Sequence, residues 1–223
     1  MIGTLINALT VLLGSSAGLI VRKKVSTDFV FDVVGLFTFY LGVEMSLKAS
    51  NPVALILGLL VGTAVGERLS LDERVRRWAD GLRKRVGGDS MFVEGMMTAF
   101  ITFCVGPMTV VGALKDGMGD PSVIMAKAVM DGFTSAAYAS AMGVGVLFSV
   151  IPLLLFQGSL SLMGSFVGLT LPTAIVSDLT GAGGVILLGL ALDLLRIKEV
   201  RVTNMLPALI TVPVISALLP TLG

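Results

Sequence analysis

Apolar runs close to the length of a membrane-spanning helix recur along the whole chain. A helix needs about 20 mostly apolar residues to cross the hydrocarbon core of a bilayer, and charged or turn residues separate such runs here. The eight runs are 2–21, 27–47, 52–66, 90–113, 121–149, 151–170, 182–195 and 205–222. We therefore predict an all-α membrane protein with about eight transmembrane helices.

The composition supports this fold class and excludes several functions. Of the 223 residues, 55% are hydrophobic and 14% are charged, whereas about 25% of the residues in a soluble domain are charged. The formal net charge of +1 gives no basic field to attract nucleic acid. The chain has no His and a single cysteine, Cys104, which excludes His-based acid–base chemistry, His-ligated metals and an intrachain disulfide.

Basic residues are distributed unevenly around the apolar runs. Arg22, Lys23 and Lys24 follow the first run, which is typical of a retained span with an external N-terminus and not of a cleaved signal peptide. With eight spans, the cytoplasmic connections 22–26, 67–89, near 150 and 196–204 hold three, seven, no and three Lys or Arg. The external connections 48–51, 112–120 and 171–181 hold only Lys48 and Lys115. The positive-inside rule then places both termini outside; the uncharged turn near 150 leaves seven spans as an alternative.

The charged stretch 67–89 predicts an amphipathic helix on the cytoplasmic surface. Its apolar residues have close to helical spacing, and arginines occupy the other face. These apolar residues are Leu69, Leu71, Val75, Trp78 and Leu82. We expect this helix to fix the topology and to bind anionic lipid, with partner binding as the alternative.

An internal repeat relates the two ends of the chain. Four blocks recur in the same order at an offset near 150. They are 14–20 with 164–170, 25–28 with 175–178, Gly35 and Glu44 with Gly184 and Asp193, and Asn51 with Asn204. We therefore divide a single transmembrane domain, 1–223, into repeat A (1–66), the helix 67–89, central spans (90–149) and repeat B (151–223).

The two repeats are expected to have opposite orientations in the bilayer. Repeat B begins five spans after repeat A, and an odd number of spans reverses the direction in which corresponding helices cross the bilayer. Where one repeat has a basic connection, the corresponding connection of the other repeat has no basic residue or a single lysine. Inverted repeats are common in secondary transporters, because two like halves of opposite orientation can exchange conformations and open a midplane site to either side. Some channels and small exporters share this architecture, so the fold alone does not separate a carrier from a channel.

Lys127 and Asp131 lie deep in the run 121–149. Asp131 is ten residues into this run, about 15 Å along a helix, and Lys127 precedes it by one turn, at the spacing of an i, i+4 ion pair. The same stripe continues through Thr134, Ser135 and Tyr138. Such a stripe has to face the bundle interior or water, either as a structural ion pair or as part of a solute or ion pathway.

Other acidic residues are shallower. Asp32 is five residues into its run, and Glu44 and Asp193 occupy matching positions in the two repeats. Each of the latter two precedes a cation, Lys48 or Arg196, so an interfacial ion pair is as compatible with the pattern as a place in the pathway. Three further carboxylates, at predicted helix starts where they offset the helix dipole, are Asp28, Glu94 and Asp178.

Glycine and proline mark two other features. Gly106, Pro107 and Thr109 lie inside the run 90–113, where a break can offer main-chain groups to a ligand and an ordinary proline kink is the alternative. Two small-xxx-small motifs can seat a second helix, either in a homodimer or within the chain. These motifs are Gly14 with Gly18 and Gly164 with Gly168.

Evidence for enzymatic chemistry is weak. The segment 117–120 has the GxGD pattern of intramembrane aspartyl proteases, but Asp120 precedes Pro121 in an expected external loop, 114–121, outside the bilayer where such enzymes pair two aspartates. Cys104 has no His partner and is expected to be a packing residue. No Walker A, metal-ligand cluster or dinucleotide fingerprint occurs, so we expect neither enzymatic activity nor a cofactor or metal.

Three segments carry a resemblance to a known family. They are MIGTLINALTVLLGSSAGLIV, CVGPMTVVGALKDGMGD and GAGGVILLGLALDLLRIKEVRVTNMLPALI. With them, essentially the whole chain resembles an uncharacterised family of bacterial membrane proteins, a domain of unknown function typified by YdfK and YqgA. The resemblance implies a polytopic helical protein of the bacterial inner membrane and no particular substrate.

The sequence therefore predicts a small secondary transporter that moves a small polar or charged solute or ion by alternating access. Its partners are the lipid bilayer and that solute, with a homodimer as one expectation for assembly and no nucleic acid. The alternative from another class is a channel or a non-transporting membrane scaffold.

Overall fold

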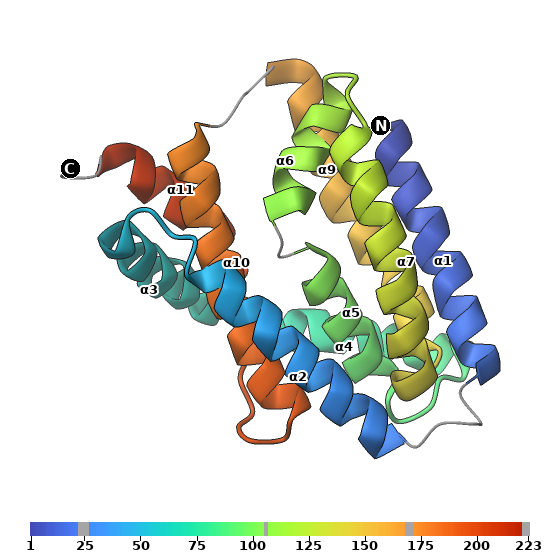
Figure 1. Ribbon diagram of the computed structural model, residues 1–223. Helices are drawn as coiled ribbons and strands as arrows, with labels where there is room; N and C mark the ends of the chain where they lie inside the picture. Colours follow the sequence, from blue (N-terminus) through green and yellow to red (C-terminus); the bar gives the residue numbers. More distant parts are fainter. Residues whose placement is uncertain (22–26, 105–106, 168–171, 220–223) are drawn as a thin grey trace. The chain divides into compact units, whose positions relative to one another are not determined.

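The computed structural model describes residues 1–21, 27–104, 107–167 and 172–219. These residues form helices joined by short turns, with no strand among them, as the apolar runs predict (Figure 1). The chain divides into two compact units. Among the described residues, unit 1 holds 1–21, 27–34, 76–104 and 108–167, and unit 2 holds 35–75, 107 and 172–219.

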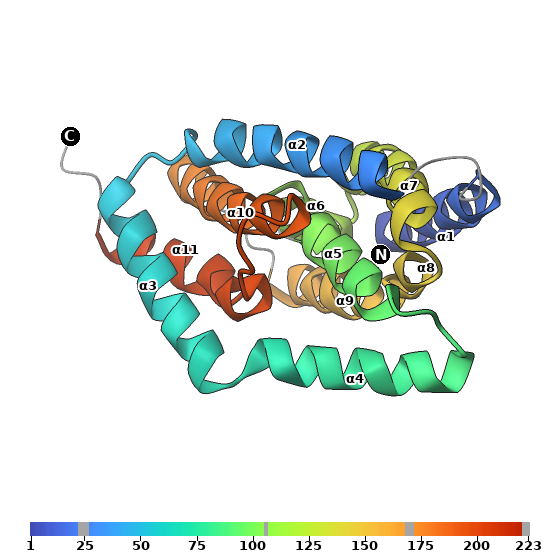
Figure 2. The ribbon, with the colours of Figure 1, turned by 90° about the horizontal axis from the view of Figure 1, so that it is seen from below.

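Unit 1 contains a closely packed pair of parallel helices, α1 and α7. Its helices are α1 (Ile2–Val21), most of α4 (Leu71–Val86), α5 (Phe92–Cys104), α6 (Pro107–Gly117), α7 (Ser122–Met142), α8 (Gly145–Phe148) and α9 (Val150–Val167). α7 lies beside α1 (Figure 2). A Cβ atom on Gly14 would lie 2.0 Å from the Gly132 carbonyl oxygen, and one on Gly18 would lie 2.1 Å from the Ala136 oxygen. Only glycine allows this approach.

The small-xxx-small motifs therefore serve packing within the chain. In the second motif, a Cβ on Gly164 of α9 would lie 2.1 Å from the Leu114 carbonyl oxygen of α6. Gly168 lies outside the described residues. The intrachain alternative accounts for the three described glycines, and nothing about them requires a homodimer.

Unit 2 contains two antiparallel helix pairs. Its helices are α2 (Thr27–Ser46) from residue 35 onward, α3 (Pro52–Arg68), α10 (Thr173–Leu194), the 3-10 helix η2 (Val202–Met205) and α11 (Ala208–Leu218). Three glycines of α3 approach α11 and η2: Gly58 faces Val212, Gly62 faces Ala208 and Gly66 faces Asn204. Residue numbers rise along one helix as they fall along the other, so the pair is antiparallel.

Asn51 sets the start of α3. Its backbone is extended, with φ −124° and ψ 91°, and its side-chain oxygen accepts a hydrogen bond of 3.0 Å from the Ala54 N–H. Pro52 follows at the first helical position, where its fixed φ suits a helix and its missing N–H needs no partner. This local signal explains why the third run begins where the sequence predicts.

The described helices contain three to five candidate membrane spans. Three are long and apolar enough by themselves: Ile2–Val21, Gly145–Phe166 and Thr173–Leu194. Two bent pairs also qualify if each is one span: Pro52–Arg68 with Leu71–Val86, at 51°, and Phe92–Cys104 with Met108–Gly117, at 68°. The all-α membrane fold is thus supported, with fewer candidate spans by this criterion than the eight apolar runs.

Three predicted boundaries are wrong. α10 begins at Thr173 and not at 182, because polar and glycine residues that interrupt its apolar run are nevertheless buried. α6 continues to Gly117, so part of the expected loop 114–121 is helical. The run 121–149 is divided, because Gly143 has a φ of +80°, a conformation that favours glycine and ends α7.

Candidate functional site

Lys127 and Asp131 form a buried ion pair in the middle of α7. Lys127 Nζ contacts Asp131 Oδ2 one helical turn away, and the two side chains are only 7% and 9% exposed. The i, i+4 spacing brings the groups together, as predicted. Pairing is needed here because an isolated charge in a low-dielectric interior is strongly destabilising.

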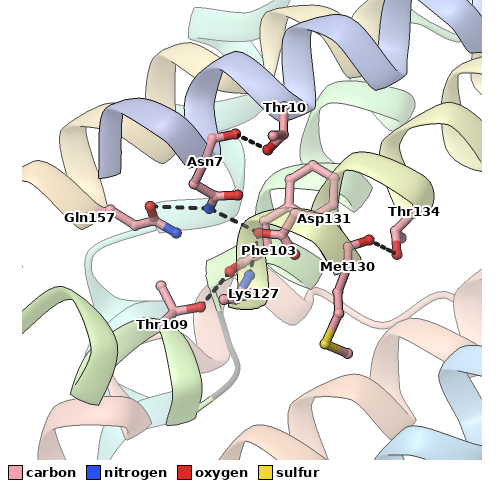
Figure 3. A network of polar contacts seen from close by, with 9 residues as sticks. All are labelled: Asn7, Thr10, Phe103, Thr109, Lys127, Met130, Asp131, Thr134 and Gln157. Carbon is pink, nitrogen blue, oxygen red and sulfur yellow. Dashed lines mark hydrogen bonds and ion pairs between the residues drawn. The ribbon is translucent and has the colours of Figure 1, made fainter. Parts of the chain in front are cut away.

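Two carboxamide side chains from other helices complete the polar cluster (Figure 3). Asn7 of α1 donates through Nδ2 to Asp131 Oδ2 at 3.0 Å and to Gln157 Oε1 of α9 at 3.2 Å. Asn7 and Gln157 are both fully buried. Helices α1, α7 and α9, all in unit 1, therefore meet at one polar point.

The Asp131 carboxylate fixes how both amides point. A carboxylate accepts hydrogen bonds only, so the Asn7 amide must present nitrogen to it, and its second N–H then faces the Gln157 oxygen. Among the described residues, Asn7 Oδ1 and Gln157 Nε2 consequently have no hydrogen-bond partner, and the same is true of Ser161 Oγ one turn along α9. Buried polar groups are normally satisfied, so this cluster has unused capacity to bind water or a ligand.

Phe103 connects the cluster to the break between α5 and α6. Its ring centroid lies 5.9 Å from Lys127 Nζ, and the ring stacks against Tyr138 at 6.3 Å. Its backbone carbonyl accepts a hydrogen bond of 2.6 Å from the Thr109 hydroxyl. Thr109 thus ties α6 to α5 near the ion pair, and the predicted offer of main-chain groups to a ligand at this break stays a prediction.

Part of the predicted stripe does not reach the cluster. Thr134 Oγ1 donates to the Met130 carbonyl of its own helix, away from the ion pair (Figure 3), and Ser135 Oγ donates to the Gly132 carbonyl. Tyr138 is buried and its hydroxyl lies 3.1 Å from Thr102 Oγ1. Hydroxyls of helical Ser and Thr often bond to the preceding turn, which is why shared spacing alone overstated the stripe.

The other predicted pathway residues lie apart from this cluster. Asp32 is exposed on α2. Glu44 is an exposed partner of Lys48 at 2.5 Å, the interfacial alternative expected from its spacing. Asp193 is half-buried in unit 2. Gly106 lies outside the described residues, as does the side chain of Pro107.

Asp178 is not a helix-start residue, contrary to the sequence prediction. It lies within α10, fully buried, and its Oδ1 accepts hydrogen bonds of 2.7 Å from the N–H groups of both Ser50 and Asn51. Its other oxygen accepts from the Ser216 hydroxyl. The carboxylate therefore anchors the segment that begins α3, and its role is structural.

Asp116 has a similar role that the sequence did not predict. The N–H groups of Gly3 and Thr4 each donate to its carboxylate at 2.9 Å, as does the Thr4 hydroxyl. The carboxylate thus satisfies the otherwise unpaired N–H groups at the start of α1. Because Asp116 belongs to α6, it is not an external loop residue.

Asp120 and Cys104 have opposite surroundings, one exposed and the other buried. Asp120 is 53% exposed, and hydrogen bonds from the Ser122 hydroxyl and N–H keep the pKa of its carboxyl below the usual range. An exposed, ionised carboxylate is unsuited to sharing a proton with a second aspartate. Cys104 is fully buried and not in a disulfide. Within the described ranges, no three acidic, Cys or His side chains are grouped to hold a metal.

Asn7 and Gln157 are the site residues that the sequence prediction missed. Both lie in apolar runs, where a single amide carries little signal. The offset of the predicted repeat is a signal that could have pointed to them, because residue 7 plus the offset of 150 is residue 157.

Comparisons with known proteins identify a family but no activity. The chain is 26% identical over 231 residues to "Uncharacterized membrane protein YdfK" of Bacillus subtilis (strain 168), covering 100% of this chain and 99% of the relative. It is 33% identical over 231 residues to "Uncharacterized protein YqgA" of Escherichia coli (strain K12), covering 97% of this chain and 96% of the relative. No solved structure matches it significantly. A family model described as "Protein of unknown function (DUF554)" matches residues 2–217, and the chain therefore belongs to this family, one of whose members is named as a membrane protein.

Proposed function

We propose that this membrane protein is a secondary transporter of the bacterial inner membrane that moves a small polar or charged solute or ion by alternating access. The observation that carries this proposal is the buried cluster of Lys127, Asp131, Asn7 and Gln157. A charged pair inside an apolar bundle is costly and by default marks a pathway. The Asn7 and Gln157 amides each have one polar atom without a hydrogen-bond partner among the described residues. These atoms could bind a ligand, which a purely structural ion pair would not need.

The polar cluster offers both signs of charge and both kinds of hydrogen-bonding group. Lys127 can attract an anion, Asp131 a cation or a proton, Asn7 Oδ1 can accept a hydrogen bond and Gln157 Nε2 can donate one. A solute with both a negative and a positive group could replace the Lys127–Asp131 contact and leave both charges compensated. This is the property expected of a site that alternates between loaded and empty states.

An inverted repeat is supported by contacts between counterpart residues. In a two-fold arrangement, residues that correspond to each other meet only near the axis. Asn7 and Gln157, at an offset of 150, are hydrogen-bonded in unit 1. In unit 2, where the offset is near 153, Thr211 Oγ1 donates to the Gly58 carbonyl at 2.6 Å. Each unit thus has one counterpart pair in direct contact.

Further contacts in unit 2 occur in corresponding pairs. A contact between two segments recurs between the counterparts of those segments, as a two-fold related repeat requires. A Cβ on Gly35 would meet the Leu195 side chain at 2.7 Å, and a Cβ on its counterpart Gly184 would meet the Ser46 nitrogen at 2.2 Å. Asn51 Nδ2 donates to the Leu219 carbonyl at the end of α11, and its counterpart Asn204 donates to Glu67 at the end of α3. These corresponding contacts support the proposed repeat, although Asn51 bonds to a backbone carbonyl and Asn204 to a side-chain carboxylate.

The helix directions favour eight crossings over seven. α1 and α7 are parallel, which suits spans one and five, and α2 and α10 are antiparallel, which suits spans two and seven. α3 and α11 are antiparallel, as spans three and eight must be. In the seven-span alternative, the chain does not turn back across the bilayer near residue 150. α11 would then be the seventh span and would run parallel to α3.

The test is solid-supported membrane electrophysiology on purified protein in liposomes. Proton and sodium jumps and a panel of amino acids, organic acids and metal ions are applied to wild type, Asp131→Asn and the matched variant Asp120→Asn. We expect a saturable current that Asp131→Asn loses and Asp120→Asn keeps. Normal current in a folded Asp131→Asn protein would refute the site, a non-saturating current would indicate a channel, and silence from all folded proteins would favour a scaffold.

A further inference from the structure

Helix α4 is anchored to unit 1 along one face. Ala79 is fully buried and packs with Phe92 and Met96, and the partly buried Leu82 extends this contact. The exposed indole of Trp78 lies outside this contact, at 44% exposure. α4 therefore has a fixed orientation on unit 1 from residue 76 onward, with a second face left outside the protein core.

That second face is hollowed. A concavity of about 230 Å³ is lined by Arg77, Trp78, Gly81, Leu82 and Arg85. Its floor is Gly81, where an added Cβ would meet no atom within 4 Å. Arg77 and Arg85 are eight residues apart, about 12 Å along the helix axis, so their long side chains can converge over Gly81.

Three charged side chains of α4 pair with one another and do not line the hollow. Asp80 pairs with Arg83 at 2.7 Å and with Lys84 at 3.0 Å. A guanidinium has five N–H donors, so Arg77 and Arg85 can bind an anion while they also contact protein groups.

We propose that this hollow binds the phosphate group of an anionic phospholipid. Arg77 and Arg85 would hold the phosphodiester between them over Gly81, because guanidinium groups match phosphate oxygens in geometry and charge. The acyl chains would lie along Trp78 and Leu82, since an indole favours the boundary between headgroups and hydrocarbon. The lipid is thereby recognised at a defined place and not only by diffuse charge attraction.

Trp78 is the single tryptophan of the chain, so its fluorescence reports on this site alone. Purified full-length protein in detergent is titrated with phosphatidylglycerol that carries brominated acyl chains, and quenching is compared with that by brominated phosphatidylcholine. We expect saturable quenching by phosphatidylglycerol. Equal, non-saturating quenching by both lipids would overturn the proposal.

The variants separate the site from general charge. We expect Arg77→Gln/Arg85→Gln to bind phosphatidylglycerol about tenfold more weakly, since loss of a charge-assisted hydrogen bond corresponds to about this factor. Lys84→Gln also removes one positive charge from α4 and should change affinity by less than about twofold. An equal loss in Lys84→Gln, or no loss in the folded double variant, would refute the site.

Two further experiments test the shape of the hollow and the source of the phosphate. Gly81→Leu keeps every charge but fills the hollow, and should abolish saturable quenching, whereas Gly158→Leu, at another glycine with open space, should not. Inorganic phosphate should not displace the brominated lipid at matched concentration. Displacement by inorganic phosphate would assign the hollow to a free anion and overturn the lipid proposal.

Discussion

Asp131 and Asp178 are buried carboxylates in the two units, and their partners differ. Asp178 in unit 2 accepts hydrogen bonds from two backbone N–H groups and one hydroxyl, all of them neutral donors. Asp131 in unit 1 is paired with a cation, Lys127, and an amide, Asn7. Beside Asp131, the Asn7 and Gln157 amides keep polar atoms that have no partner within the described part of the chain, whereas the donors around Asp178 come from the start of α3 and from α11.

The difference teaches that burial of a charge does not by itself identify a functional site. Asp178 holds together three helices of unit 2, and two of its three donors are backbone N–H groups, which a solute cannot displace without disturbing the start of α3. Lys127 is a flexible side chain that a solute or proton could replace. The kind of partner, more than the depth of the residue, separates an anchor from a candidate binding site.

The largest loss of stability is expected for Asp178→Leu. This change removes the acceptor of the Ser50 N–H and of the buried Asn51 N–H and places an apolar side chain among them, at a cost of about 4 kcal/mol in the free energy of unfolding. Asp178→Asn keeps one acceptor oxygen and should cost about half as much. Thermal and denaturant unfolding in detergent measure both. Equal stability of Asp178→Leu and wild type would contradict the anchor role.

Asp178 also shows where sequence analysis reaches its limit. The helix α10 could be recognised from its apolar residues, but its start could not, because Asp178, Thr180 and Gly181 resemble a loop in sequence. Their burial depends on contacts with α2, α3 and α11, which no local pattern contains. The all-α fold followed from the apolar runs, since their lengths are a property of the chain itself, whereas the repeat stays a prediction from self-comparison.

The candidate site, like the fold, could be predicted from the sequence only in part. The Lys127–Asp131 pair could be predicted because i, i+4 neighbours meet on any helix. The place of Asn7 and Gln157 beside it could not, since it depends on the packing of α1 and α9 against α7. Thr134 has suitable spacing but bonds to its own helix, a choice set by local geometry.

The second prediction is that removing Asp131 restores stability lost on removing Lys127. Lys127→Met should cost about 3 kcal/mol, because it leaves Asp131 as an unpaired buried charge, and Lys127→Met/Asp131→Leu should recover most of that loss. Flux should be absent from both proteins. A double-mutant cycle on unfolding free energy measures the coupling. A double variant that is no more stable than the single variant would mean that the charges do not depend on each other.

Replacing Asn7 and replacing Gln157 should lower stability by different amounts, although the proposed repeat makes the two residues counterparts. Asn7→Leu removes a charge-assisted bond to Asp131 and a bond to Gln157, for about 2 kcal/mol. Gln157→Leu removes one neutral bond, for about 1 kcal/mol or less. Unfolding measurements compare the two, with flux assays on the folded variants. A larger cost for Gln157→Leu would indicate that its Nε2 has a bound partner in the protein.

The smallest effect is expected at Asp120, a carboxylate exposed to solvent. Its hydrogen bonds from Ser122 place the folded pKa below the unfolded value, so the stabilisation is present above about pH 4 and is lost as the pH falls through the folded pKa. Asp120→Asn should therefore be slightly less stable than wild type at pH 7, and this difference should shrink as the pH falls through the folded pKa of the wild-type carboxyl. Unfolding curves over a series of falling pH values test this. An exposed group bound by local donors has no coupling to the buried cluster, so flux at pH 7 should be unchanged; a loss of flux would instead link the loop before α7 to the transport site.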